Sequence, residues 1–221
     1  MTTGDGKPSL RDMRSKLESR NPKSETMTAN PKSEIYGLVL IGGRSMRMGR
    51  DKAMLRFGAK PQAMAAYELL AQCCAKVFLS CRQGQTMDLP MIYDVVEDIG
   101  PMGGILSAFH AHPDKAWLVL ACDLPFLTVP TLRHLIAHRD PSQLATAYRS
   151  AHDGKPEPLC AIYEPAIAER LRAFVARGDH CPRKALTKLA VPLLNLPEVR
   201  ALDNVNHPHE FEEARAALMK Q

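Results

Sequence analysis

IYGLVLIGGRSMRMGRDK, residues 35–52, joins an apolar run to a loop rich in glycine and basic side chains. The apolar run ends at Leu40 and predicts a buried strand. Gly42 and Gly43 follow, and glycine lets a backbone turn sharply and approach an anion closely. Exposed N–H groups in such a loop bind phosphate oxygens. Four basic residues within nine positions add charge-assisted hydrogen bonds to a polyphosphate: Arg44, Arg47, Arg50 and Lys52.

The spacing of this loop excludes two common nucleotide-binding motifs. A Walker A loop requires Lys and then Ser or Thr directly after its second glycine, but Gly49 is followed by Arg50, Asp51 and Lys52. A dinucleotide fingerprint requires Gly-x-Gly-x-x-Gly, which the glycines of residues 42–49 do not match. A solvated basic turn is the alternative, and the position after a first strand favours a phosphate loop instead.

Strand-like and helix-like blocks alternate from residue 35 onward, which predicts an α/β fold with a mostly parallel sheet and crossover helices. We expect strands at residues 35–40, 77–80, 91–93, 117–121 and 145–148. We expect helices at residues 63–74, 103–111, 129–138, 166–176, 182–188 and 208–219. Residues 1–34 are polar and predict a disordered tail, which leaves 35–221 as the folded domain.

Composition limits the classes of partner. The net charge is +5, but basic and acidic residues are interspersed and aromatic residues make up only 5%, which argues against nucleic acid. Six cysteines without a C-x-x-C pair predict reduced thiols. No secretion signal or membrane-spanning apolar stretch is recognised, so we expect a cytoplasmic protein without a membrane partner.

A second candidate site follows the apolar run at residues 117–121, which delivers Asp123 at its carboxyl end. Parallel sheets present functional groups at that end of their strands. Magnesium is commonly bound by one or two carboxylates together with substrate phosphates, so Asp123 is a candidate metal ligand. A turn or N-cap aspartate is the alternative. The glycine loop upstream favours the metal role.

Other polar connections receive weaker assignments. Asp94 could accept hydrogen bonds from a base or ribose, and Gly103 and Gly104 would let a helix N-terminus approach a ligand. Asn206 is a candidate ligand or a simple turn residue. Residues 155–160 resemble a proline-stiffened loop that enters a strand, in a position suggesting a wall of the acceptor site.

The histidines favour surface roles over a zinc site. His134 and His138 lie one helical turn apart, but Leu135 stands where a zincin would carry Glu. The cysteines supply no paired ligand spacing. No Gly-x-Ser-x-Gly nucleophile elbow is present either, so covalent catalysis through serine is unsupported.

The string at residues 40–52 closely resembles the L-A-G-G-x-S-x-R-M-G-x-D-K signature of the MobA-like nucleotidyltransferases. Three further motifs occur in that family's order, at residues 100–104, 122–125 and 204–206. The resemblance covers residues 35 to about 215. It implies a Rossmann-like three-layer sandwich of the nucleotide-diphospho-sugar transferase type, and Mg²⁺-dependent transfer of GMP from GTP to the phosphate of molybdopterin.

The resemblance also implies roles for individual residues. Nucleotide contacts would come from Leu40, Ile41 and Gly42; phosphate contacts from Gly43, Arg47 and Lys52; a guanosine contact from Asp94; Mg²⁺ binding from Asp123; and a position near metal and acceptor from Asn206. On this view Lys52, Arg47 and Asp123 carry catalysis. Molybdoenzymes or other cofactor-biosynthesis proteins are the further partners it suggests.

Two departures keep alternatives open. Ile41 replaces the family's usual alanine, and Ser80 stands where some members carry asparagine near the nucleotide. Cytidylyltransferase relatives resemble L-A-A-G at the loop, so Gly42 favours guanine at one position only. Transfer from CTP, transfer to a sugar phosphate, and a non-catalytic nucleotide-binding regulatory module are the competing interpretations.

Overall fold

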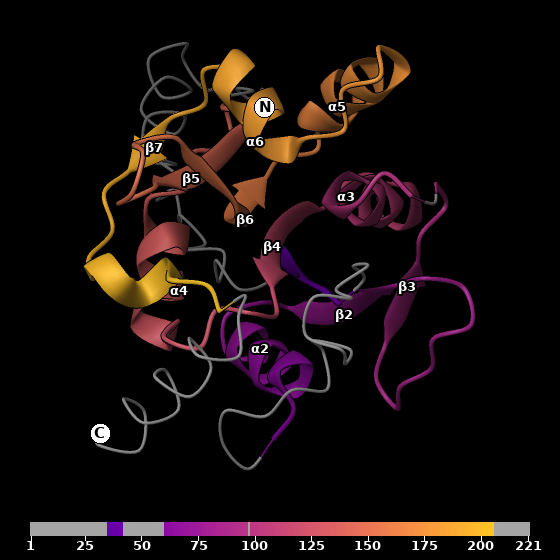
Figure 1. Cartoon of the computed structure of the whole chain (residues 1–221), viewed down its shortest axis with the longest axis horizontal. Helices are drawn as coiled ribbons and strands as arrows, with labels where there is room; N and C mark the ends of the chain where they lie inside the picture. Colours follow the sequence, from indigo (N-terminus) through magenta and orange to yellow (C-terminus); the bar gives the residue numbers. More distant parts are fainter. Residues whose placement is uncertain (1–34, 42–59, 97, 206–221) are drawn as a thin grey trace, which may run out of the picture.

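The computed structural model describes residues 35–41, 60–96 and 98–205. A seven-stranded sheet runs through it in the order β3-β2-β1-β4-β6-β5-β7 (Figure 1). The strands are β1 (Ile35–Leu40), β2 (Lys76–Cys81), β3 (Met91–Tyr93), β4 (Ala116–Ala121), β5 (Ala145–Arg149), β6 (Pro156–Tyr163) and β7 (Leu193–Leu194). Every pairing is parallel except those that β6 makes with β4 and β5. The predicted mostly parallel sheet is confirmed.

Helices cover both faces of the sheet (Figure 1). They are α2 (Gln62–Ala71), α3 (Pro101–Ala111), α4 (Val129–Ala137), α5 (Ile167–Ala176) and α6 (Pro182–Lys188), and a short 3₁₀ turn, η4, spans Val199–Leu202. Apolar residues of α2 and α4 pack in one core, and those of α3, α5 and α6 in a second. The fold is therefore the expected three-layer α/β sandwich.

Alternation along the central strands explains how one sheet serves two cores. In β4, Leu118 and Leu120 face the core beneath α2 and α4, whereas Trp117 and Val119 face the core beneath α3 and α5. Successive side chains of a strand point to opposite faces, so a strand covered on both sides must be apolar throughout. All six residues of β4 are buried accordingly.

Residues 155–160 are predicted as a loop that enters a strand, but the strand β6 already begins at Pro156, and the prolines in it have a physical explanation. β4 pairs with β6 only from Cys160 to Tyr163, so the first half of β6 projects past the end of β4. Pro156 and Pro158 lie in this projecting half, which pairs with β5 alone. Proline is tolerated where no neighbouring strand needs its missing N–H. The sequence also did not predict the short elements β7 and η4.

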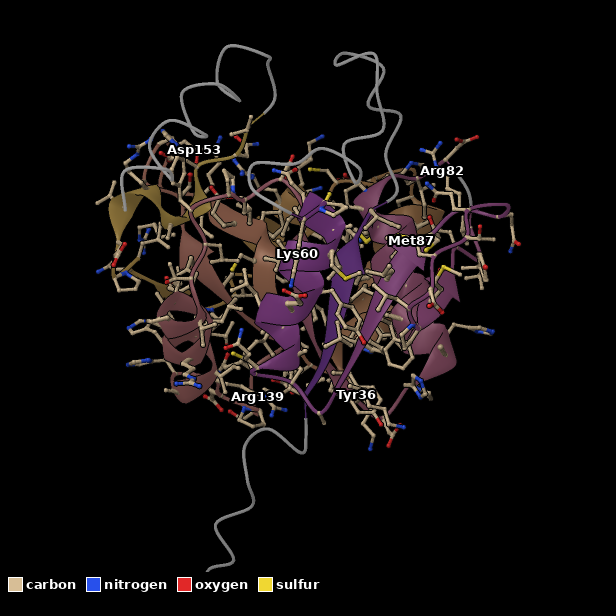
Figure 2. All side chains as sticks on the ribbon, turned by 90° about the horizontal axis from the view of Figure 1, so that it is seen from below. Tyr36, Lys60, Arg82, Met87, Arg139 and Asp153 are labelled. Carbon is tan, nitrogen blue, oxygen red and sulfur yellow. The ribbon has the colours of Figure 1, made fainter. Side chains whose placement is uncertain are left out.

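The carboxyl ends of the parallel strands meet at one edge of the sheet. Leu40 is in register with Ser80 on one side and Ala121 on the other, and Ser80 is in register with Ile92. Figure 2 shows Arg82, which directly follows β2, at this edge and Tyr36 at the opposite edge. Among the described helices, none is long and apolar enough to cross a bilayer. The predicted helix at 208–219 and the predicted tail at 1–34 lie outside the described residues.

Candidate functional site

The end of β1 is enclosed by its neighbours. Leu40 and Ile41 are both buried, and the Ile41 N–H donates a hydrogen bond of 3.3 Å to the Ser80 carbonyl oxygen. This bond continues the β1–β2 ladder one residue beyond the strand. The chain therefore leaves the sheet at a fixed position, directly before Gly42, where the described segment stops.

Asp94 is held beside this point by Ser80. The Ser80 hydroxyl donates to Asp94 Oδ1 over 3.0 Å, and the Asp94 N–H donates to the Cys81 carbonyl over 2.9 Å. Ser80 itself is only 2% exposed. Burial and the negative charge of Asp94 raise the pKa of the Cys81 thiol to about 11. The carboxylate thus lies at the carboxyl end of β3 with a defined orientation.

Gly103 and Gly104 let helix α3 approach these strands closely. A methyl group on Gly104 would collide with Ser80 Oγ and lie 2.7 Å from Leu40 Cδ2, and one on Gly103 would lie 2.7 Å from the Val96 carbonyl oxygen. Both contacts are shorter than real Cβ contacts, so a side chain at either position would force the neighbouring atoms to move. The space these glycines leave is occupied by the ends of β1 and β2 and by the loop after β3.

Ser107 ties the loop after β3 to the same helix. Its hydroxyl donates to the Gly103 carbonyl oxygen over 2.7 Å and accepts from the Val95 N–H over 2.9 Å. Ser107 is 1% exposed, so this relay is shielded from water. The loop that carries Asp94 is therefore fixed at both of its sides, by Ser80 and by Ser107.

Asp123 follows β4 by two residues and joins a later part of the chain. Its carbonyl oxygen accepts a 3.2 Å hydrogen bond from the Val205 N–H. The segment after η4 is thus fastened to the carboxyl end of β4, although more than 80 residues separate the two in sequence. Asn206, the next residue, lies outside the described part of the chain.

A cavity of about 600 Å³ opens beside Asp123. Its walls come from the start of α3 at Pro101, the projecting half of β6 at 157–160, and the start of α6 at 180–183. Leu202 and Asn204 close the side formed by the segment after η4. Small-molecule sites commonly measure 300 to 1,000 Å³. The cavity can therefore accommodate a compound of cofactor size.

Charged groups are paired around the rim of this cavity. Arg183 contacts Glu157 at 2.8 Å and Asp153 at 3.4 Å, and His152 lies 3.4 Å from Asp203. Figure 2 shows Asp153 at the same end of the molecule as Arg82, which is the carboxyl end of the parallel strands. A ligand here meets both carboxylate acceptors and guanidinium donors, a combination suited to a polar heterocycle or a phosphate.

Comparisons with known sequences identify the family of this chain. The sequence profile of the MobA-like NTP transferase domain matches residues 37–193. The chain belongs to the MobA-like NTP transferase family. A molybdenum cofactor biosynthesis bifunctional protein from Synechocystis sp. is 37% identical over 182 residues, which cover 80% of this chain and 52% of that protein. This chain therefore spans about half the length of that relative.

One further relative and one solved structure match over most of their own length. A probable molybdenum cofactor guanylyltransferase from Pelotomaculum thermopropionicum is 30% identical over 189 residues, covering 81% of this chain and 91% of that protein. The crystal structure of molybdopterin-guanine dinucleotide biosynthesis protein A from Archaeoglobus fulgidus superposes with a TM-score of 0.70 at 21% identity. The superposition covers 84% of this chain and 100% of the Archaeoglobus chain. Membership of the family places the chain among the nucleotidyltransferases.

The structure brings four of the residues singled out from sequence to one edge of the sheet: Leu40, Ile41, Asp94 and Asp123. Five further candidates lie outside the described residues: Gly42, Gly43, Arg47, Lys52 and Asn206. Their assignments remain predictions. The described positions run from the end of β1 along neighbouring strand ends, and Asp123 among them lines the cavity.

Sequence reasoning named no individual residue in the far wall of the cavity. Glu157 is enclosed between two prolines, and Arg183 stands at the start of a helix, two features that are ordinary in isolation. Their pairing links positions 26 residues apart, which no local pattern reveals. Residues 157–160 line the cavity, and their role as a wall of the acceptor site stays a prediction.

The donor set at Asp123 is compatible with a hard cation that also binds substrate. Within the described ranges, no group of three or more His, Cys, Asp or Glu side chains forms a preassembled metal cage. Magnesium does not need one, since it retains waters and takes phosphate oxygens alongside one or two carboxylates. Asp123 is one of the residues that line the cavity.

Proposed function

We propose that this chain transfers GMP from GTP to the phosphate of molybdopterin, with release of pyrophosphate, in a Mg²⁺-dependent reaction. The observation that carries the proposal is the placement of Asp123 in a cofactor-sized cavity that also reaches Pro101 at the start of α3. That helix packs on Ser80 of β2 and on Leu40. Leu40 is the last residue of β1, where the proposed nucleotide loop begins. A donor nucleotide and an acceptor would therefore meet at the Asp123 carboxylate.

The two substrates would occupy different parts of the strand edge. The nucleotide would lie over the ends of β1 and β3, with Asp94 accepting hydrogen bonds from its guanosine portion. The fixed orientation of Asp94 through Ser80 supports this role because an oriented acceptor selects a donor pattern. The acceptor would lie in the cavity, between Asp123 and the ion-paired rim of Glu157 and Arg183.

The reaction requires positioning more than covalent chemistry from the protein. An oxygen of the acceptor phosphate attacks the α-phosphorus of GTP, a new phosphoanhydride bond forms, and the bond to the departing pyrophosphate breaks. Arg47 and Lys52 would hold the β- and γ-phosphates, where negative charge grows as pyrophosphate leaves. Asp123 would hold Mg²⁺, which when bound neutralises phosphate charge. Alignment of the two substrates by the chain accounts for the rest.

Two rival functions make different predictions. A cytidylyltransferase or sugar-phosphate nucleotidyltransferase of the same fold would release pyrophosphate with another NTP or another acceptor. A regulatory module would bind nucleotide without turnover. The pair of Lys52 and Asp123 favours turnover, since nucleotide binding alone does not require a carboxylate for the metal. A cytoplasmic location and contacts with molybdoenzymes remain predictions.

The decisive experiment measures pyrophosphate release with GTP, CTP, ATP and UTP, each with and without molybdopterin. We expect turnover with GTP and molybdopterin, dependent on Mg²⁺. Asp123→Asn and Lys52→Ala should each lower the rate by at least about 100-fold, the range for loss of one group that stabilises transition-state charge. Turnover with CTP alone would refute the guanylyl assignment.

The chain offers a matched control for Asp123. Asp114 is an exposed aspartate that precedes β4, whereas Asp123 follows the same strand at the opposite edge of the sheet. Asp114→Asn removes the same charge without touching the cavity, so its rate should equal that of the parent. Equal rates in the parent, Asp114→Asn and Asp123→Asn would exclude the proposed site.

A further inference from the structure

Glu157 lies in the wall of the cavity, in the projecting half of β6. Its Oε2 atom accepts a 2.8 Å hydrogen bond from Nη2 of Arg183, near the start of α6. The start of α6 and Pro101 at the start of α3 also form walls of the cavity. Apolar residues of both helices pack in one core, on one side of the sheet. The Glu157 carboxylate therefore lies on the side of the sheet where these two walls stand.

The second carboxylate oxygen of Glu157 is open to a ligand. Among the described residues, Oε1 has no hydrogen-bond partner, and it is not one of the buried side-chain atoms that lack a partner. The side chain keeps 18% of its surface exposed, so solvent reaches this oxygen. Each carboxylate oxygen accepts more than one hydrogen bond, so Oε2 also retains capacity beside its bond to Arg183.

The described lining of the cavity holds two other carboxylates, Asp123 and Asp153. Asp123 is the proposed metal ligand. Asp153 already uses both of its oxygens, because Oδ1 accepts from the Lys155 N–H over 3.1 Å and Oδ2 contacts Arg183 at 3.4 Å. Glu157 is therefore the lining carboxylate with the most capacity to accept hydrogen bonds from an organic ligand.

Apolar residues surround the pair of Glu157 and Arg183. Those in the lining are Pro101, Leu124, Pro158, Leu159, Pro182 and Leu202. Pockets that are apolar except for a few polar groups suit flat heterocycles, whose faces become buried while the polar groups fix one edge. Glu157 stands between Pro156 and Pro158, whose rings restrict the backbone on both sides of it.

We propose that Glu157 binds the acceptor through the aminopyrimidinone edge of a pterin ring. The inference rests on the proposed function, under which molybdopterin occupies the cavity. A pterin carries a 2-amino group beside a ring N3–H, so two donors point in one direction. A carboxylate accepts from two such parallel donors with its two oxygens, as it does from arginine. Arg183 is a positioning residue, which holds the Oε2 atom in place.

Pterin and lumazine test this contact directly. Lumazine has a carbonyl oxygen where pterin has its 2-amino group, and both rings fluoresce, so anisotropy reports their binding to the full chain without GTP or Mg²⁺. The parent should bind pterin at least about tenfold more tightly than lumazine, the lower end for loss of a hydrogen bond to a charged group. Glu157→Gln should remove or reverse that preference, because its amide can donate to the lumazine oxygen.

Matched variants separate recognition from folding. Glu169→Gln on α5 alters an exposed glutamate that also pairs with an arginine, outside the cavity lining, and should leave both affinities unchanged. Should Glu157→Gln bind neither ring, Glu157→Asp keeps the charge and should retain a preference for pterin. Arg183→Gln should reduce the preference for pterin, and Arg183→Lys should restore part of it. Equal binding of pterin and lumazine by the parent, or an unchanged preference in Glu157→Gln, would overturn the proposal.

Guanine has the same aminopyrimidinone edge as a pterin, so turnover must separate acceptor from donor. In the pyrophosphate assay, Glu157→Gln should raise the KM for molybdopterin at least about tenfold, while kcat and the KM for GTP stay within about twofold. A raised KM for GTP instead, with guanosine displacing pterin, would assign Glu157 to the donor nucleotide and overturn the proposal.

The two assays also distinguish this inference from the function on which it rests. Transfer of GMP with an unchanged KM for molybdopterin in Glu157→Gln would refute the role of Glu157 alone. Selective pterin binding that depends on Glu157, without any transfer of GMP by the parent, would refute the proposed function and leave the pterin contact in place.

Discussion

Gly104→Ala should destabilise the protein although alanine is the better helix former. The new methyl group would collide with Ser80 Oγ and lie 2.7 Å from Leu40 Cδ2, inside a packed core. Overpacking of this kind costs roughly 1–3 kcal/mol. Displacing Ser80 also breaks its bond to the Asp94 carboxylate, worth about 1.5–3 kcal/mol for a charged acceptor. The gain from replacing a helical glycine by alanine is only about 1 kcal/mol. We expect a net loss of about 3 kcal/mol in the free energy of unfolding.

Urea unfolding monitored by tryptophan fluorescence measures this loss directly. The chain has one tryptophan, Trp117, which is fully buried in β4 and reports on the core against which α3 packs. Unchanged stability, or a gain of about 1 kcal/mol from helix propensity alone, would refute the steric argument.

A double-mutant cycle identifies Ser80 as the group in conflict. In a Ser80→Ala background the closest atom to the new methyl group is gone, and the bond to Asp94 has already been lost. Gly104→Ala should then cost at least about 1 kcal/mol less than it does in the parent, because contacting residues are coupled. Additive costs would place the strain elsewhere in the helix.

Two further predictions concern stability. Glu164 is 2% exposed and pairs with Arg139 through two hydrogen bonds of 2.7 and 2.8 Å. Glu164→Ala should therefore lower the free energy of unfolding by about 3–5 kcal/mol in urea titrations, and adding Arg139→Met should recover part of that loss. A loss below about 1 kcal/mol would count against a buried pair. Burial raises the pKa of Cys81 to about 11 and that of Cys160 to about 12, from 9.0, and the charges of Asp94 and Glu157 contribute. Because the unfolded chain ionises first, the contribution of these thiols is intact below pH 9 and declines as pH rises toward 11 to 12. A Cys81→Ala, Cys160→Ala variant should therefore lose less stability than the parent between pH 8 and 10.5, and equal losses would contradict the raised pKa values.

The sequence was sufficient for the parallel half of the fold because its signals there are local. An uninterrupted apolar run predicts a strand covered on both faces, and β1 and β4 have that form. Glycine and aspartate directly after such runs predicted functional groups at the carboxyl edge, where Asp94 and Asp123 lie. Each of these inferences needed only a few consecutive residues.

The antiparallel half was harder because its determinants are distant in sequence. Pro156 and Pro158 argue against a strand, and only the tertiary structure shows that the pairing of β4 with β6 stops before it reaches them. The partnership of Glu157 with Arg183, and the bond from Val205 to Asp123, both depend on tertiary folding.

The projecting half of β6 has a consequence for how such a protein can diversify. Its first residues pair with β5 alone, so changes at 156–159 leave the β1–β4 register untouched. Residues there also line the cavity, whereas the strand ends of β1 and β3 do not. Mutation and recombination can therefore reshape the cavity while the strand ends of β1 and β3 stay constant. If the proposed function holds, a library confined to this overhang would explore new acceptors against a fixed donor nucleotide, which makes it a natural starting point for directed evolution.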